Sequence, residues 1–252
     1  MLKSLKKYIS SILPFYFLKK AKWVYHNPKN YWMPPPIKNI NFHIKAVLDS
    51  LNRPFHFIQI GSNNGSLNDP LYPFFSQYQC KGVLIEPVPY IFEELKKTYA
   101  DFKHLSFENI AISDHNGTID FYVVKKSDDP NIPSWYNQLS SFDPKFILKH
   151  KNQIPNIESL IEKTNLPCRT IQSLVDQYQI NDLDILHIDT EGYDYEIIKT
   201  IDFNKLHPAI LYFEHNHLSK SQYKECLRLL HTKYKTIYRN TTWDTICLNP
   251  RR

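Results

Sequence analysis

The stretch "FIQIGSNNGS", residues 57–66, joins a short apolar run to two glycines, Gly61 and Gly65, that are separated by three residues. Glycine is scarce in this chain, with 5 glycines in 252 residues against a usual share of roughly 7%. Glycine tolerates positive φ and lets another backbone or a ligand come close. The stretch therefore predicts a buried strand that ends in a tight turn beside a ligand.

The composition favours one soluble domain with a substantial core. The chain is 42% hydrophobic over 252 residues, and its 17 prolines argue against one long helical bundle. Its four cysteines are widely spaced and include no C-x-x-C pair: Cys80, Cys168, Cys226 and Cys247. This spacing predicts free thiols and a reducing cytoplasm rather than secretion.

The net charge of +6 comes from the N-terminus. Residues 1–22 contain six lysines and no acidic residue, so the other 25 basic residues balance all 25 acidic ones. A nucleic-acid footprint needs a basic face, and this balance does not favour one. We therefore expect no nucleic-acid partner.

Residues 1–40 are predicted to form a basic N-terminal helix and a proline-rich linker ahead of a main domain over 41–252. The uncharged stretch in the tail is shorter than the ~20 apolar residues that span a bilayer. Two interpretations stay open for this tail. One is a helix that packs on its own domain, and the other is a peripheral contact with the anionic inner face of a membrane.

Strand and helix patterns alternate along the main domain. Strands are predicted at 55–60, 82–86, 105–113, 183–189 and 209–216. Helices are predicted at 41–52, 67–78, 89–100, 170–180, 193–201 and 219–234. This alternation predicts an α/β fold with a mostly parallel sheet and helices on both faces. In such sheets the ligand lies beyond the carboxyl ends of the strands.

Three other segments have patterns of their own. The Asn116-Gly117 turn and the alternation after it predict a hairpin added to the sheet. Residues 235–240 and 244–249 predict a closing hairpin. Residues 125–166 contain four scattered prolines and are predicted to be irregular, as in a functional loop or lid.

The ends of the first three strands suggest a nucleoside site. Residues 61–65 read G-x-x-x-G, whereas a dinucleotide fingerprint is G-x-G-x-x-G, and its middle glycine is replaced here by Asn63. Glu86 closes the second strand 25 residues after the first glycine, where a ribose diol finds a carboxylate acceptor. Asn109 and Ala111 follow the third strand and are placed to flank an adenine ring. A plain turn or surface position would account for each of these residues singly.

The fourth and fifth strands end in "HIDTEGYD" and "FEHNH", which deliver acids and imidazoles to the same edge of the sheet. The catalytic candidates are Asp189, Glu191, Glu214 and His215. His215 is the favoured base because an unperturbed imidazole titrates near pH 6.5. His187 lies one residue pair deeper on the fourth strand and is interpreted as a core histidine.

A metal-assisted alternative uses the same two strand ends. Asp189, Glu214 and Asn216 would offer the oxygen ligands that Mg²⁺ accepts. A helix cap or a solvated turn would explain any one of these residues alone. Their convergence at the ligand edge is what favours a chemical role.

Taken together, these motifs resemble the class I S-adenosylmethionine-dependent methyltransferases, and within them the FkbM family. The resemblance covers about residues 55–249, and its most specific element is Asp-x-Glu-Gly at 189–192. The segments that carry it are "FIQIGSNNGS", "LIEPVPYIFEEL", "ENIAISDHNGTIDFYVV", "CRTIQSLVD", "ILHIDTEGYDYEIIK" and "LYFEHN".

The resemblance implies a seven-stranded Rossmann-like sheet whose last strand is antiparallel. It also implies S-adenosylmethionine as cofactor and O-methylation of an alcohol, commonly a sugar hydroxyl of a glycan or glycolipid, or a polyketide. The residues expected at the cofactor are Gln59, Gly61, Ser62, Asn63, Gly65, Glu86, Pro87, Asn109, Ala111 and Asp189. Many methyltransferases have an acid where Gln59 stands, and glutamine accepts a hydrogen bond from the methionine ammonium without bringing charge.

Two other classes of function remain as alternatives. A nicotinamide-dependent oxidoreductase would require the middle glycine of the G-x-G-x-x-G fingerprint and its third glycine, and both are missing here. A catalytically silent nucleoside-binding module would keep the glycine turn and Glu86 but would not need acids after the fourth and fifth strands.

Overall fold

The computed structural model describes residues 34, 36, 37, 39–65, 69–240 and 243–249. The helix predicted in the basic tail lies outside these residues. Every helix in the described ranges falls short of the length and apolar character that a membrane crossing requires.

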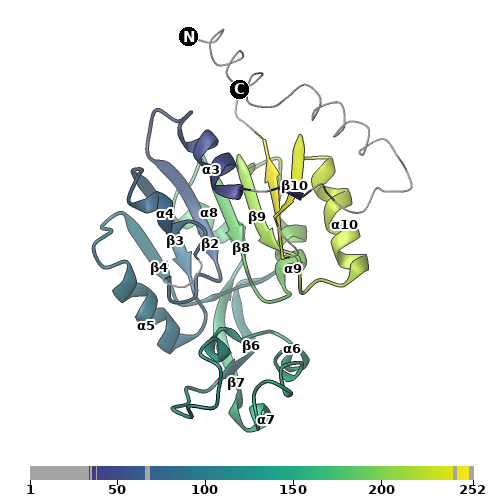
Figure 1. The fold of residues 1–252 in the computed structure, drawn as a ribbon. Helices are drawn as coiled ribbons and strands as arrows, with labels where there is room; N and C mark the ends of the chain where they lie inside the picture. The colour runs from purple at the N-terminus through teal and green to yellow at the C-terminus, as the bar shows by residue number, and fades with distance from the viewer. Residues whose placement is uncertain (1–33, 35, 38, 66–68, 241–242, 250–252) are drawn as a thin grey trace.

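Eight strands of the described chain form the main sheet, in the order β1-β10-β11-β9-β8-β2-β3-β4 (Figure 1). Their bounds are β1 (Pro36–Ile37), β2 (Phe55–Ile60), β3 (Cys80–Ile85), β4 (Leu105–Glu108), β8 (Ile185–Ile188), β9 (Ile210–Glu214), β10 (Thr236–Asn240) and β11 (Asp244–Leu248). The central strands are parallel, and β11 is antiparallel to both of its neighbours. The Rossmann-like fold is therefore confirmed, with the two-residue β1 as a strand beyond the expected seven.

Helices cover both faces of this sheet. One face carries α3 (Ile40–Leu48), α4 (Tyr72–Phe75) and α5 (Pro89–Thr98), and the other carries α8 (Ile171–Gln177), α9 (Asp194–Thr200) and α10 (Lys220–His231). Along β2 the side chains alternate between the two cores: Phe55 and Phe57 pack with α3 and α5, while Ile58 and Ile60 pack with α8 and α9. A central parallel strand is buried on both faces, which explains its nearly continuous apolar run.

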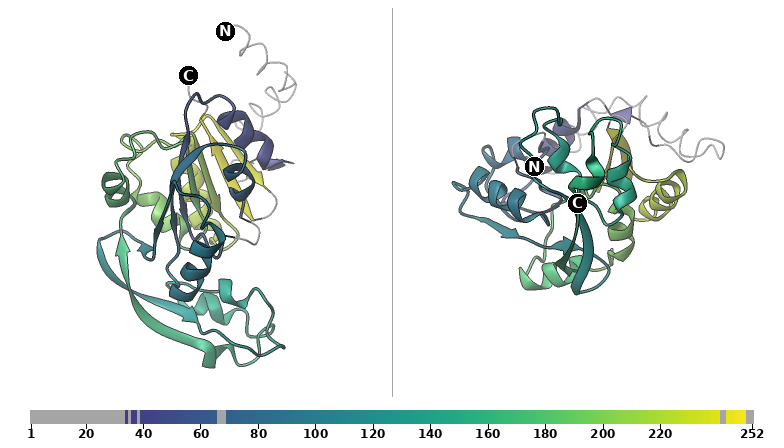
Figure 2. Two further views of the ribbon diagram at one scale, coloured as in Figure 1. Left: turned by 90° about the vertical axis from the view of Figure 1, so that its left-hand side faces the viewer. Right: turned by 90° about the horizontal axis from the view of Figure 1, so that it is seen from below.

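A second, three-stranded sheet has the order β5-β7-β6. It consists of β5 (Ala111–Ile112), β6 (Gly117–Val124) and β7 (Ile161–Arg169). The segment that connects β6 to β7 contains a 3₁₀ turn, η1 (Tyr136–Gln138), and two short helices, α6 (Pro144–Leu148) and α7 (Ile157–Leu160). Figure 2 shows β6 and β7 as a long pair that leaves the main sheet and ends beside α6 and α7. A small core holds this part together: Val124, Leu139, Phe146, Ile147, Ile154 and Ile157.

This second sheet corrects three of the sequence predictions. The predicted strand 105–113 is two strands, because the Asn109 side chain donates to the carbonyls of Glu86 and Pro87 and the chain leaves the main sheet there. The hairpin predicted at the Asn116-Gly117 turn does not form, because β5 and β6 each pair with β7 in the second sheet and not with each other. The irregular interpretation of residues 125–166 missed two short helices and most of β7, whose partners lie about 45 residues earlier in sequence.

The predicted helix 67–78 was also too long. Its described part holds only the four-residue α4, which has a proline near its start. Pro70 and Pro73 restrict helix propagation through this segment, because proline has no backbone N–H to donate and its ring clashes with the preceding turn.

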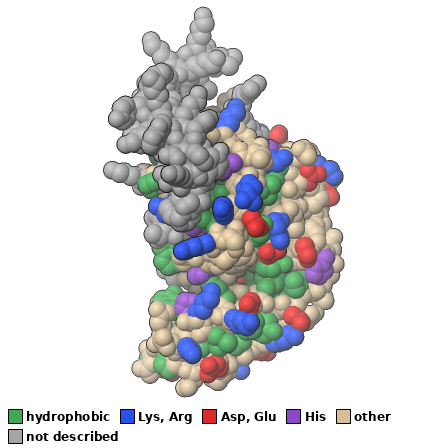
Figure 3. All heavy atoms as spheres, turned by 90° about the vertical axis from the view of Figure 1, so that its right-hand side faces the viewer, with side chains coloured by type: hydrophobic (Ala, Val, Ile, Leu, Met, Phe, Trp, Pro, Cys, Tyr) green, Lys and Arg blue, Asp and Glu red, His purple; other side chains and the backbone are tan. Residues whose placement is uncertain are grey.

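Charged side chains are interspersed on the face of the molecule drawn in Figure 3, where lysines and arginines alternate with acidic residues. This mixture agrees with the balance of charges outside the N-terminal tail.

The turn after β2 joins the ends of three strands. The N–H groups of Gly61 and Ser62 both donate to the Ile85 carbonyl at the end of β3, at 3.0 and 2.9 Å. The N–H of Asp189, just after β8, donates to the Ile60 carbonyl at 2.9 Å. Gly61 has φ +77°, and a Cβ there would stand 1.7 Å from the Asp189 carbonyl oxygen. Glycine is therefore required at position 61 because the Asp189 backbone lies so close, and not because a ligand needs the space.

Gly61→Ala is expected to lower the free energy of unfolding by more than about 2 kcal/mol, because backbone strain of ~1–3 kcal/mol adds to a clash of similar cost. Urea denaturation measures the change. Gly117→Ala is the matched control: it also has positive φ, but its added Cβ meets nothing closer than His115 at 3.8 Å. Equal losses in both variants would show that the Asp189 contact does not matter.

Candidate active site

A cleft of about 330 Å³ opens at the carboxyl ends of β2, β3, β8 and β9, and the second sheet closes one of its sides. Ten of the predicted site residues line it: Gln59, Gly61, Ser62, Asn63, Glu86, Pro87, Ala111, Asp189, Glu191 and Glu214. Four predicted site residues do not line it: Gly65, Asn109, His215 and Asn216. The volume falls within the range of ligand pockets, ~300–1,000 Å³.

Glu86 is held in a fixed orientation at the end of β3. Its Oε2 accepts from the Asn63 N–H and its Oε1 from the Val88 N–H, both at 2.9 Å. The side chain is 5% exposed, and burial raises its pKa to about 7. Each oxygen can accept a second hydrogen bond, so the carboxylate could bind the ribose diol of the nucleoside ligand that the sequence predicts.

The Gln59 side chain reaches the same cleft with an unused acceptor. Gln59 is 2% exposed, and its Oε1 has no hydrogen-bond partner among the described residues. A buried polar atom without a partner marks a place where a ligand donor is missing. An acceptor in this position suits the ammonium group of a methionine moiety.

Asp69 is a cleft residue that the sequence analysis missed. It lines the cleft and forms a side-chain hydrogen bond with Gln59. The Tyr99 hydroxyl and the Leu71 N–H also donate to it, while burial raises its pKa. Asp69 thus brings a carboxylate beside the glutamine that stands where many methyltransferases have an acid. It lies in a loop before α4, where no pattern marked it.

Gly65 and Asn109 have structural roles in this fold. A Cβ on Gly65 would stand 2.2 Å from the Tyr99 ring, so this glycine allows α5 to pack against the loop. Asn109 holds the chain at the end of β3 through the carbonyls of Glu86 and Pro87. Gly65 and Asn109, for which cofactor contacts were predicted, thus lie outside the cleft lining and support neighbouring cleft residues.

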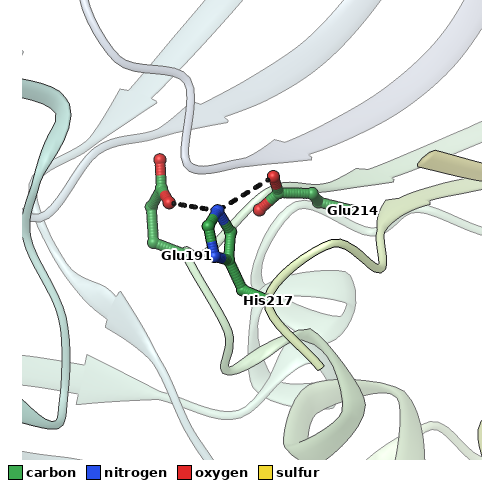
Figure 4. A group of neighbouring side chains, drawn as sticks. All are labelled: Glu191, Glu214 and His217. Carbon is green, nitrogen blue, oxygen red and sulfur yellow. Dashed lines mark ion pairs between the residues drawn. The ribbon is translucent and has the colours of Figure 1, made fainter. Parts of the chain in front are cut away.

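Three side chains meet where β8 and β9 end. His217 Nε2 lies 3.2 Å from Glu191 Oε2 and 3.3 Å from Glu214 Oε1 (Figure 4). Glu191 adopts left-handed backbone geometry at φ +54°, and Gly192 follows at φ +105°. The buried Asp194 carboxylate accepts from the Thr190 hydroxyl at 2.9 Å and so braces this turn.

Burial and mutual repulsion raise the pKa values of the carboxyl groups at this edge. The pKa of Glu191 rises to about 8, and that of Glu214 to about 11 through burial and the neighbouring charge of Asp189. The pKa of Asp189 is also raised, first by burial and then by Glu191. Like charges in a site of low dielectric disfavour ionisation. A bound cation would reverse this effect.

The favoured base, His215, points away from the cleft. Its Nδ1 lies 3.0 Å from the Thr245 hydroxyl, and its ring stacks on Tyr223 at 4.5 Å between centroids. Burial lowers its pKa to about 4. His217, two residues later, is the imidazole that reaches the carboxylates. β9 ends at Glu214, two residues before the end of the predicted strand, so His215 and His217 lie in the turn that follows.

The other two polar candidates, Asn216 and His187, differ in burial. Asn216 is exposed, with its Nδ2 3.5 Å from His217 Nε2. His187 is 5% exposed and stacks on Tyr212, as expected for a core histidine, although it also forms part of the cleft floor. Burial lowers its pKa to about 3.

Comparison with solved structures gives distant relatives. The methyltransferase FkbM of Methylobacillus flagellatus KT is 12% identical in sequence, with a TM-score of 0.49. The match covers 80% of this chain and 45% of that protein, so this chain spans less than half the length of that protein. A methyltransferase of Geobacter sulfurreducens has 11% identity and a TM-score of 0.41, covering 99% of this chain and 96% of its own. The ribosomal protein L11 methylase of Lactobacillus delbrueckii subsp. bulgaricus has 7% identity and a TM-score of 0.40, and the match covers 83% of this chain and 77% of that protein.

No curated protein sequence matches the chain. The family model described as the methyltransferase FkbM domain matches residues 59–236, which is more than half of the chain. The match begins at Gln59 on the first cleft strand and includes Glu86, the Asp-x-Glu-Gly turn and His217. The chain therefore belongs to the FkbM family of methyltransferases.

Proposed function

We propose that the protein is an S-adenosylmethionine-dependent O-methyltransferase that acts on a hydroxyl group of a sugar in a glycan or glycolipid. Membership of a methyltransferase family implies S-adenosylmethionine as the methyl donor. The observation that carries the finer proposal is the single cleft shared by Glu86, the glycine turn and the carboxylates after β8 and β9. A methyl donor and a hydroxyl acceptor would meet there.

The cofactor half of the cleft has a partner for each polar part of this donor. Glu86 would accept the ribose hydroxyls, and Gln59 with Asp69 would receive the methionine ammonium. Pro87 and Ala111 line the wall on which the adenine ring would lie. When bound, the cofactor supplies a methyl group whose C–S bond breaks as a C–O bond forms, with the bonding pair left on sulfur.

The acceptor half has the surface that a sugar ring needs. Phe142 and the half-exposed Trp243 offer aromatic faces, and Gln138 and Ser140 offer hydrogen-bonding groups. Sugars combine apolar C–H faces with polar hydroxyl edges, which suits this combination. Three of these four residues come from the segment between β6 and β7, which therefore supplies most of the acceptor wall.

Asp189 is the residue we assign to the hydroxyl proton. It lines the cleft, and its backbone lies against the glycine turn, which places the residue where the two halves of the site meet. Glu191 and Glu214 would hold the acceptor oxygen. A sugar hydroxyl is a poor nucleophile, and a positioned base in hydrogen-bond reach is the usual remedy.

The two alternative functions fare less well. The family match favours a methyltransferase over a nicotinamide-dependent oxidoreductase. A silent nucleoside-binding module would have no use for the close grouping of Glu191, Glu214 and His217.

Loss of the Glu86 carboxylate is expected to weaken S-adenosylmethionine binding about tenfold to a hundredfold, because a hydrogen bond to a charged group contributes ~1.5–3 kcal/mol. Isothermal titration with Glu86→Ala measures this, and Asp69→Asn should give a loss in the same range. Glu93→Ala, on the exposed face of α5, is the control for Glu86.

Tyr99→Phe is the control for Asp69, since it removes one hydrogen bond to Asp69 and keeps the carboxylate. Native affinity in a folded Glu86→Ala protein would remove this residue from the cofactor site.

Asp189→Asn is expected to slow methyl transfer by about 10²–10⁴, the range of a positioned acid or base, with little change in cofactor affinity. Single-turnover rates and cofactor titration separate the two effects. His215→Ala should keep most of the native turnover, because its imidazole does not reach the cleft. The reverse pattern, with slow His215→Ala and native Asp189→Asn, would contradict the assignment.

Incubation with radiolabelled S-adenosylmethionine and a panel of sugar acceptors tests the reaction itself. We expect label in an O-methyl ether of a sugar, identified by mass spectrometry and NMR. Label on nitrogen or carbon, or transfer only to acceptors without sugar, would contradict the proposal. Boiled enzyme and the Asp189→Asn variant serve as controls.

A further inference from the structure

We propose that Glu191, Glu214 and His217 bind a divalent transition-metal cation. The three side chains come from different segments: Glu191 from the turn after β8, Glu214 from the end of β9, and His217 from the turn before α10 (Figure 4). One ligand atom from each lies within 4.8 Å of the others. The proposed methyl transfer gives the His217 imidazole no role.

The spacing of the ligand atoms fits a metal centre. His217 Nε2 is 3.2 Å from one Glu191 oxygen and 3.3 Å from one Glu214 oxygen. In a site with ligand bonds of about 2.1 Å, two ligand atoms at right angles stand about 3.0 Å apart. Each carboxylate has a second oxygen, so small rotations bring all three residues onto one ion.

An unsatisfied acceptor supports the same conclusion independently. Glu214 is 93% buried, with a relative exposure of 7%, and its Oε2 has no hydrogen-bond partner among the described residues. Within the described ranges, no other basic side chain lies as close to either glutamate carboxylate as His217 does. Buried carboxylates are normally paired or coordinate a metal. A cation is the missing partner.

The donor set indicates which cations bind. Two carboxylate oxygens are ligands for Mg²⁺ and Mn²⁺, whereas an imidazole nitrogen favours transition metals. A mixed set of two carboxylates and one imidazole therefore favours Mn²⁺ or a similar ion over Mg²⁺. This set shares only Glu214 with the Asp189, Glu214 and Asn216 combination suggested by the sequence, because Asn216 is exposed and the turn brings in Glu191 and His217.

The catalytic consequence rests on the proposed O-methylation, whereas the binding itself does not. A cation at this position would polarise the acceptor oxygen and lower the pKa of its hydroxyl group. The hydroxyl proton would then pass to the Asp189 carboxylate at lower cost. The imidazole of His217 would serve as a ligand and would not take the proton.

Mn²⁺ binding to the full-length protein tests the site without cofactor or acceptor. After removal of metal with EDTA and dialysis, titration calorimetry and the loss of the free Mn²⁺ EPR signal should both report one bound ion. Glu214→Gln and His217→Ala should each weaken this binding more than about tenfold, since even outer-shell partners of metal ligands contribute 10–100-fold. Mg²⁺ should bind more weakly than Mn²⁺.

The matched control is Glu225→Gln, an exposed glutamate on α10 bonded to Tyr195, which should bind Mn²⁺ as the native protein does. Native Mn²⁺ affinity in both Glu214→Gln and His217→Ala, or no binding by the native protein, would overturn the proposal. If one variant fails to fold, the other still decides, because the two residues lie on different segments. Equal loss in Glu225→Gln would also overturn it.

Activity then separates this inference from the proposed function. Sugar methylation that survives EDTA, in a protein that binds no Mn²⁺, would remove the metal site and keep the O-methyltransferase. Mn²⁺ binding that depends on Glu214 and His217, with no methyl transfer to any sugar, would keep the metal site and remove the proposed reaction. Activity abolished by EDTA and restored by Mn²⁺ would support both.

Discussion

The contact between Gly61 and the carbonyl of Asp189 determines where the chemistry of this protein lies. A side chain at position 61 would overlap the Asp189 backbone, which can approach so closely only because residue 61 has no Cβ. The approach is held by the hydrogen bond from Asp189 N–H to the Ile60 carbonyl and by the paired N–H groups that reach Ile85. The turn that shapes the cofactor half and the turn that carries the acids are thus one joined unit.

Carboxyl groups are concentrated on the acceptor side of that unit. Asp189, Glu191 and Glu214 are all drawn into a partly closed edge, where burial and repulsion raise their pKa values. Such an arrangement is costly in the isolated protein and becomes favourable when positive charge enters. A sulfonium cofactor and a divalent cation both supply that charge.

The second sheet and the segment between its long strands add a wall to the cleft of this common fold. β6 and β7 run away from the main sheet and carry a small apolar core of their own, so the segment between them is folded and not a loose loop. Residues 138–142 of that segment return to the cleft beside the glycine turn. The main sheet provides the Rossmann-like core, and this excursion is where we expect acceptor choice to be set.

The sequence by itself determined the central strands and what ends them. The apolar run at 55–60 is strand β2 at the predicted bounds, and Glu86 and Asp189 lie at the predicted edge, because local hydrophobicity and glycine placement dictate both. Only the tertiary structure decided which imidazole reaches the acids, since a turn after Glu214 sends His215 toward Tyr223 and His217 toward Glu191. It also decided the pairing of β7 and the place of Asp69, because both depend on partners far away in the chain that no local pattern records.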